Sequence, residues 1–147
     1  MKLRNFQRVI FSLVFILFAH CGWAEEWIPY EDSKTGARYY EKNSIKQVEN
    51  NIVRIWTIKV YNKEGKAKDF YMLTQKGQAP QSADMLNLSS IMVDLDCNNN
   101  KFKLNALTIY DRGKKAIFSA PESMFKWNEV VDNTSSGKLK NKICKKK

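Results

Sequence analysis

Histidine is almost absent from this sequence, and cysteine is rare. His20 is the only histidine among 147 residues, and there are three cysteines. Beyond residue 20 the chain therefore holds no Ser-His-Asp or Cys-His catalytic arrangement and no side chain whose ordinary pKa lies near neutrality. Too few cysteine and histidine ligands remain for a structural zinc site, and no glycine-rich phosphate loop is present. These absences favour a binding protein, and we expect no catalytic, cofactor-binding or metal-binding residues.

Long apolar runs are also missing, apart from one short run near the N-terminus. Residues 9–19 are almost entirely apolar, but this run falls short of the roughly 20 residues that a membrane-spanning helix needs. It follows residues 1–8, which contain three basic residues and no acidic one. It precedes Gly22-Trp23-Ala24, which places small residues just before a cleavage point at the end of Ala24. This order is typical of a secretory signal peptide. We expect residues 1–24 to be removed and residues 25–147 to fold as one domain.

The sequence leaves the processing of this segment open. A lipoprotein signal also places a cysteine after the apolar run, as Cys21 does here, but His20 stands before it where a small residue is expected. We therefore favour cleavage after Ala24 over lipid attachment at Cys21. An uncleaved membrane anchor is a further alternative. An acyl chain would hold the protein at a membrane, whereas cleavage after Ala24 would leave it without that anchor.

Cleavage after Ala24 would leave two cysteines, Cys97 and Cys144. Exported chains enter an oxidising compartment, where cysteine pairs form disulfides. The two cysteines lack the CxxC spacing of redox enzymes, so we expect a structural Cys97–Cys144 disulfide. Closing the long loop between them is expected to stabilise the fold by about 4 kcal/mol.

Acidic residues are few relative to basic ones, with 15 against 25 and a net charge of +10. The basic excess is concentrated at the C-terminus, where six lysines stand without an acidic residue among them: Lys138, Lys140, Lys142, Lys145, Lys146 and Lys147. Such a run can contact an anionic glycan, a membrane surface or a protein partner. The alternative is a solvated terminus that only aids solubility. Export argues against nucleic acid as the partner.

Glycine and proline are sparse, and they separate short segments rich in β-branched and aromatic residues. This pattern predicts strands at residues 27–30, 37–41, 52–61, 88–97, 101–110 and 116–119. Both faces of segment 52–61 are partly apolar, so we expect a central strand there, preceded by a hairpin turn at Asn50-Asn51. Pro121 is expected to end the last strand.

Residues 62–86 are the least defined part of the sequence. We expect a turn at 62–66, a strand or a short helix at 69–75, and an exposed loop at 77–84. Long loops often carry function, so the whole segment is a candidate binding surface.

Two acidic residues, Asp94 and Asp96, alternate with apolar residues in segment 88–97. This period of two predicts that both carboxylates lie on the exposed face of a half-buried strand. A paired acid and base is the alternative, which we disfavour because charged residues on a solvated face are ordinary. For Trp27, Trp56 and Trp127, we favour core packing over an exposed aromatic binding strip.

The C-terminal pattern changes from strand to helix. Residues 133–136 offer N-cap side chains, and Leu139 and Ile143 stand four apart. We expect a short helix at about 135–145 whose Leu139, Ile143 and Cys144 face the sheet.

The ordered set of these segments resembles the surface-adhesin protein E family of exported bacterial proteins. The residues on which this resemblance rests are Trp27, 36–40, 44–45, 53–56, Asp96-Cys97, 107–110, Trp127, and Cys144 after a short helix. The resemblance implies an α+β fold, with an antiparallel sheet of about six strands and a C-terminal helix packed on it. It also implies a location in the periplasm, at the outer membrane or at the cell surface.

The same resemblance implies an adhesin that binds host matrix or serum proteins such as vitronectin and laminin. The alternative function is a periplasmic structural or assembly partner of other envelope proteins, with no host ligand.

Overall fold

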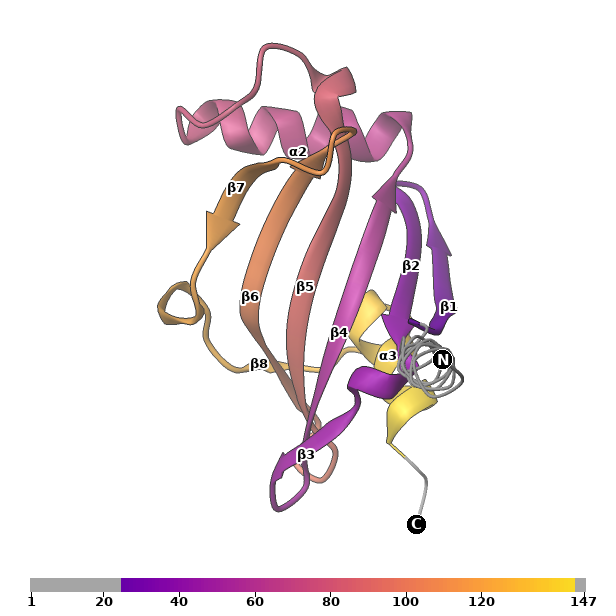
Figure 1. The fold of residues 1–147 in the computed structure, drawn as a ribbon. Helices are drawn as coiled ribbons and strands as arrows, with labels where there is room; N and C mark the ends of the chain where they lie inside the picture. The colour runs from indigo at the N-terminus through magenta and orange to yellow at the C-terminus, as the bar shows by residue number, and fades with distance from the viewer. Residues whose placement is uncertain (1–24, 145–147) are drawn as a thin grey trace, which may run out of the picture.

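Eight strands form one antiparallel sheet in residues 25–144, the part of the chain that the computed structural model describes (Figure 1). The main strand order is β1-β2-β4-β5-β6-β7, with β3 added beside β4 and β8 beside β6. The strands are β1 (Trp27–Ser33), β2 (Gly36–Glu41), β3 (Lys46–Glu49), β4 (Ile52–Tyr61), β5 (Leu86–Asp96), β6 (Lys101–Asp111), β7 (Ala116–Ala120) and β8 (Asn128–Glu129). The helices are α2 (Lys63–Gln75) and α3 (Ser135–Ile143). The α+β prediction is confirmed.

The expected signal peptide, with its alternative Cys21 site, lies outside the described residues. So do Lys145, Lys146 and Lys147. From residue 25 to residue 144, the chain contains no helix long and apolar enough to cross a membrane.

The predicted central strand and hairpins are confirmed. β4 pairs with β2, β3 and β5, so it lies within the sheet. Asn51 and Asn100 have φ values of 70° and 56°, in the turns that join β3 to β4 and β5 to β6. Asparagine adopts this left-handed conformation more readily than most residues do. The segment at 116–119 is not the last strand, because β8 pairs with the start of β6 after an intervening loop.

The turn expected at residues 62–66 is wrong, because helix α2 begins there. The Asn62 side chain caps the helix by accepting a hydrogen bond from the Gly65 amide at 2.9 Å. Gly65 is required for close packing, since a Cβ atom at this position would collide with the Thr35 carbonyl oxygen of the β1–β2 turn. Asn62 and Gly65 therefore stabilise the start of a helix instead of forming a turn. For residues 69–75, where the sequence predicts a strand or a short helix, the helix is correct.

Both helices cover the same face of the sheet. Ile55 and Tyr61 point to one face of β4, because they are separated by an even number of residues. Ile55 packs in the cluster that contains Leu139 of α3, and Tyr61 packs in the cluster that contains Leu73 of α2. We call this side the covered face; α2 crosses one end of the sheet and α3 lies at the other (Figure 1).

The opposite face, which we call the open face, carries Trp56 and Val60, each 39% exposed. Trp127, after β7, is 40% exposed, while Trp27 is half-buried. The expectation that the tryptophans pack in the core is therefore wrong for Trp56 and Trp127. Trp56 alternates with the buried Ile55 and Thr57 along β4, and neither helix covers its side of the sheet.

Helix α3 is attached to the sheet at both of its ends. At its C-terminal end, Cys144 forms the predicted disulfide with Cys97, with 5.6 Å between the Cα atoms. At its N-terminal end, Thr134 caps the helix, and Ser135 donates a hydrogen bond to Glu31 of β1. Leu139 is 2% exposed and Ile143 packs beside it, so the predicted apolar side of the helix is confirmed.

Candidate functional site

The C-terminal lysines do not all point to solvent. Lys138 Nζ donates to Glu31 Oε1 at 3.1 Å, and Lys140 Nζ donates to Asn100 Oδ1 at 2.5 Å. Lys142 is exposed. Lys138 and Lys140 therefore hold α3 in place. Of the three C-terminal lysines that the structure describes, Lys142 is the most available to a partner.

The two candidate binding surfaces taken from the sequence lie far apart. Segment 62–86 forms α2 and the loop after it at one end of the sheet, and α3 lies at the opposite end (Figure 1). Tyr71 on α2 is 67% exposed and is the most exposed large apolar side chain described. A partner that contacts both segments would have to span the length of the strands.

Asp94 is buried, so its predicted place on a solvated face is wrong. It is 4% exposed and accepts from Arg54 Nε at 2.8 Å and from Arg54 Nη2 at 2.9 Å. Burial alone would raise the pKa of Asp94, but the hydrogen bonds from Arg54 hold it below its usual value. Arg54 lies directly opposite Asp94 in the β4–β5 register. This carboxylate is held as one half of a cross-strand ion pair.

Asp96 stabilises the turn between β5 and β6. Its carboxylate accepts hydrogen bonds from the Asn98 amide at 3.1 Å and from the Asn99 amide at 2.9 Å. These bonds, chiefly the one from Asn99, lower the pKa of Asp96. Asp94 and Asp96 therefore have separate structural partners and do not form an acid–base pair.

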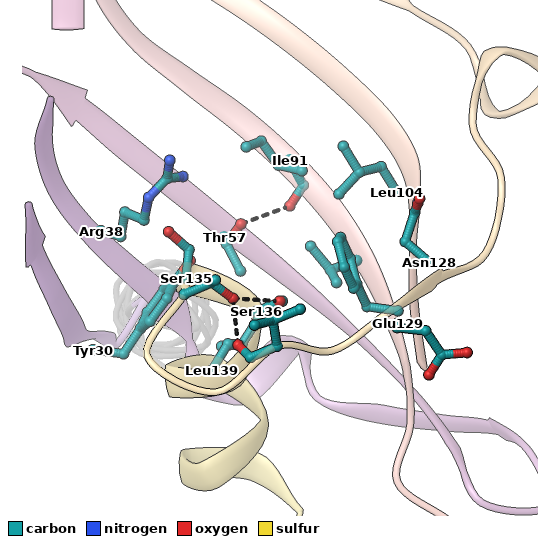
Figure 2. Close-up of a pocket in the computed structure, with 14 residues that line it drawn as sticks. Tyr30, Arg38, Thr57, Ile91, Leu104, Asn128, Glu129, Ser135, Ser136 and Leu139 are labelled. Atoms are coloured by element: carbon teal, nitrogen blue, oxygen red, sulfur yellow. Dashed lines mark hydrogen bonds between the residues drawn. The ribbon is translucent and has the colours of Figure 1, made fainter. Parts of the chain in front are cut away.

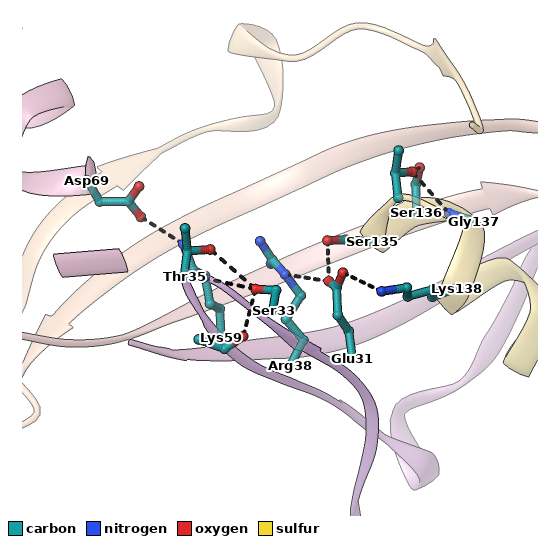
Figure 3. Close-up of polar contacts among 12 residues, drawn as sticks. Glu31, Ser33, Thr35, Arg38, Lys59, Asp69, Ser135, Ser136, Gly137 and Lys138 are labelled. Atoms are coloured by element: carbon teal, nitrogen blue, oxygen red, sulfur yellow. Dashed lines mark hydrogen bonds and ion pairs between the residues drawn. The ribbon is translucent and has the colours of Figure 1, made fainter. Parts of the chain in front are cut away.

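A cluster of charged side chains, which sequence reasoning did not select, lies on the covered face (Figure 3). Arg38 and Lys59 are directly opposite each other on β2 and β4. Like charges in this position destabilise a sheet unless each is neutralised. Arg38 Nε lies 3.0 Å from Glu31 Oε2, and Lys59 Nζ lies 3.5 Å from Asp69 Oδ2. We call the five residues Glu31, Arg38, Lys59, Asp69 and Lys138 the charge cluster.

The charge cluster joins five elements of the fold, with Arg38 on β2. Glu31 comes from β1, Lys59 from β4, Asp69 from α2 and Lys138 from α3. The side chains of Lys59 and Glu31 are each only 6% exposed. Burial lowers the pKa of Lys59, and the nearby Asp69 carboxylate offsets part of that effect. Because the charge cluster brings together segments that are far apart in the sequence, no local sequence pattern revealed it.

Replacing Glu31 with glutamine is expected to lower the free energy of unfolding at neutral pH by about 1–3 kcal/mol, because Arg38 and Lys138 lose their buried carboxylate partner. Burial raises the pKa of Glu31, but hydrogen bonds from Ser135 and Lys138, together with the charge of Arg38, bring it below its usual value. The ionised form therefore stabilises the fold above the unfolded pKa of about 4.3, and this contribution is lost as the pH falls through the folded pKa.

Urea unfolding at a series of pH values measures this effect. The acid-induced loss of stability should be shallower in Glu31→Gln than in the wild type. Glu49→Gln, at an exposed position on β3, is the matched control and should retain the wild-type slope. If Glu31→Gln keeps the wild-type slope, the Glu31 carboxylate does not contribute to the pH dependence of the free energy of unfolding.

A groove of about 500 Å³ lies beside the charge cluster, between the covered face and the segment that leads into α3 (Figure 2). Its apolar lining comes from β5, β6, the segment before α3, and α3, and consists of Ile91, Val93, Phe102, Leu104, Val131 and Leu139. Its polar lining includes Tyr30, Arg38, Thr57, Ser135 and Ser136. We call this cavity the sheet groove.

Two irregularities in strand pairing lie beside the sheet groove. The β1–β2 register shifts between Pro29 and Glu31, and the β5–β6 register shifts between Met92 and Val93. Such bulges bend a sheet and redirect side chains. Tyr30 falls within the first shift, and burial raises the pKa of its hydroxyl while the positive charge of Arg38 opposes that rise.

The chemistry of the sheet groove suits recognition. Hydroxyl groups, the Asn128 amide, the Glu129 carboxylate and one guanidinium lie around an apolar lining, as in sites that hold a ligand through a few polar contacts. Across residues 25–144 no three His, Cys, Asp or Glu side chains are grouped so that they could hold a metal ion.

Comparison with models of known protein families gives a match over most of the chain. The family model described as surface-adhesin protein E matches residues 27–145, which is most of the chain and nearly all of the part that the structure describes. No curated protein and no solved structure matches the chain significantly.

Proposed function

Because this chain belongs to the surface-adhesin protein E family, we propose that it is a non-catalytic adhesin of the bacterial envelope that binds a host matrix or serum protein. The family match over residues 27–145 is the observation that carries this proposal. It covers the whole sheet and α3. In this account residues 1–24 export the chain and are removed, and residues 25–147 are the binding domain.

The site geometry supports binding over catalysis. The two carboxylates that offered the best acid–base pair, Asp94 and Asp96, are each committed to structural bonds. The open face, the loop after β7 and helix α2 instead present large side chains to solvent, which include Trp56, Trp127 and Tyr71. Exposed aromatic residues are common in protein interfaces, where they supply large contact areas.

We assign the basic contact surface to the C-terminal end alone. Lys142 is exposed there, and Lys145, Lys146 and Lys147 follow directly in the sequence. Segment 62–86 lies at the other end of the sheet and is a separate candidate surface. The basic end would attract an acidic region of a host protein or an anionic glycan by charge complementarity.

Binding of the purified mature protein to immobilised vitronectin, laminin and heparin tests this assignment. Changing Lys145, Lys146 and Lys147 together to glutamine is expected to weaken binding about tenfold, at roughly 0.5 kcal/mol per exposed charge. The cysteines stay in place, so the disulfide is preserved.

The matched control removes three exposed lysines from the loops that follow β1 and β6, outside both candidate surfaces: Lys34, Lys114 and Lys115. This variant has the same net charge as the tail variant and should bind like the wild type. Equal loss in both variants would indicate a nonspecific charge effect. Unchanged binding in the tail variant would remove the C-terminal lysines from the contact surface.

A further inference from the structure

We propose that the sheet groove binds a small amphipathic acid, a molecule with an apolar chain and one anionic head group. This site is distinct from the basic contact surface assigned to Lys142, Lys145, Lys146 and Lys147, and it does not depend on the proposed adhesion. The apolar chain would lie along β5, β6 and α3, and the head group would lie at Arg38.

The size and lining of the groove fit such a ligand. Its volume of about 500 Å³ falls within the 300–1,000 Å³ typical of small-molecule sites. Ile91, Val93 and Leu104 from the sheet and Leu139 from α3 supply apolar contacts. Figure 2 shows Ile91 and Leu104 on one side of the groove, with Tyr30, Arg38 and Thr57 toward the other. The lining therefore holds its cation, Arg38, at one end, apolar side chains along its length, and Asn128 and Glu129 on the side of Leu104.

The charge at the polar end favours an anion. The charge cluster contains three cations, Arg38, Lys59 and Lys138, but only two carboxylates, Glu31 and Asp69. Glu31 is shared, because it also accepts hydrogen bonds from Lys138 and Ser135. One positive charge in the cluster is thus left without a carboxylate of its own.

Arg38 is the cation of this cluster that lines the groove. Its Nε atom is buried and makes no hydrogen bond within residues 25–144, although Glu31 lies at ion-pair distance. Because Glu31 also accepts from Lys138 and Ser135, an anionic ligand oxygen near the guanidinium would gain a charge-assisted contact. Glu129 on the other side of the groove is exposed and lies 3.8 Å from Lys101, which offsets its charge.

The segment before α3 forms one wall of the sheet groove, and we expect a ligand to enter the groove there. Val131 in this segment is 58% exposed, and β8 pairs with β6 at only two positions. Ser136 lines the groove at the start of α3, and its hydroxyl lies 2.9 Å from that of Thr134. A bulky residue at Ser136 should therefore obstruct the groove without removing a member of the charge cluster.

Titration with octanoate and with octanamide, followed by NMR chemical shifts of the mature protein, tests the proposal. The two probes share one chain, and only octanoate carries a charge. We expect octanoate to bind with a Kd of about 1 mM, and about tenfold more tightly than octanamide, with shift changes at Ile91, Leu104 and Leu139. Equal affinity for the two probes, or shifts confined to other regions, would overturn the proposal.

Two variants assign the site. Ser136→Trp should weaken octanoate binding about tenfold or more, whereas Lys142→Gln, outside the groove, should leave it unchanged. Arg38→Met should abolish the preference for octanoate over octanamide. If Arg38→Met does not fold, Ser136→Trp still decides, because unchanged octanoate binding in that folded variant would overturn the proposal. Binding to vitronectin or laminin is not part of this test, so its failure would leave the adhesin proposal standing.

Discussion

Replacing Cys97 and Cys144 with serine is expected to lower the free energy of unfolding by about 4 kcal/mol. The disulfide closes a segment with a sequence separation of 47, and it restricts the unfolded chain more than the folded one. It also fixes the C-terminal end of α3, whose N-terminal end is held by Glu31. Equilibrium unfolding in urea measures the loss.

The reduced wild-type protein is the control for this substitution. Its stability should match that of the double serine variant, because both lack only the covalent link. Near-UV circular dichroism should show whether α3 stays packed on the sheet in either form. A stability change below about 1 kcal/mol would contradict the role assigned to the disulfide.

Asp69→Ala is expected to destabilise the fold by about 3 kcal/mol, because it leaves Lys59 buried without its carboxylate. Lys59 is 5% exposed and lies opposite Arg38, a like charge. Its Nζ is 4.7 Å from the centre of the Tyr61 ring, a contact that is weaker than an ion pair. Thermal and urea unfolding of the purified variant measure the effect.

Two comparisons separate the buried pair from a general effect of charge removal. Glu26→Ala breaks the exposed pair of Lys42 and Glu26, where both side chains are at least half exposed, so it should cost less than about 1 kcal/mol. The double variant Lys59→Met with Asp69→Leu should recover most of the stability, because no buried charge remains. An Asp69→Ala variant as stable as the wild type would show that Lys59 does not need this partner.

Local patterns were sufficient to predict much of the sheet. Segment 52–61 combines β-branched and aromatic residues and is strand β4 over the same bounds. The asparagines at its start and after Asp96 correctly marked the hairpin turns. The short C-terminal helix also followed from local signals, since Thr134 caps it and Leu139 faces the sheet.

The failures arose where tertiary contacts decide the local structure. Asn62 and Gly65 are typical of turns, but Gly65 is needed because α2 packs against the β1–β2 turn. Asp94 alternates like a solvent-facing residue, but its partner Arg54 lies on the neighbouring strand, 40 residues away. The burial of a charged side chain depends on a partner that the alternation of a single strand does not reveal.

The sheet groove was not predictable for the same reason. It combines residues from β1, β2, β4, β5 and β6 with the segment that leads into α3. Lys138 and Glu31, which hold α3 in place at its N-terminal end, are separated by 107 residues. The C-terminal lysines were identified from the sequence, but the use of two of them to anchor α3 depends on these distant contacts.

Binding of the purified mature protein, with its disulfide formed, to immobilised vitronectin and laminin is the measurement that tests the adhesin account most directly. We predict saturable binding to at least one of them, with a Kd of about 1 μM or lower, which a basic control protein of similar size does not reproduce. Absence of saturable binding to these and to other matrix and serum proteins, together with specific capture of envelope proteins, would contradict the account and support the alternative role in envelope assembly.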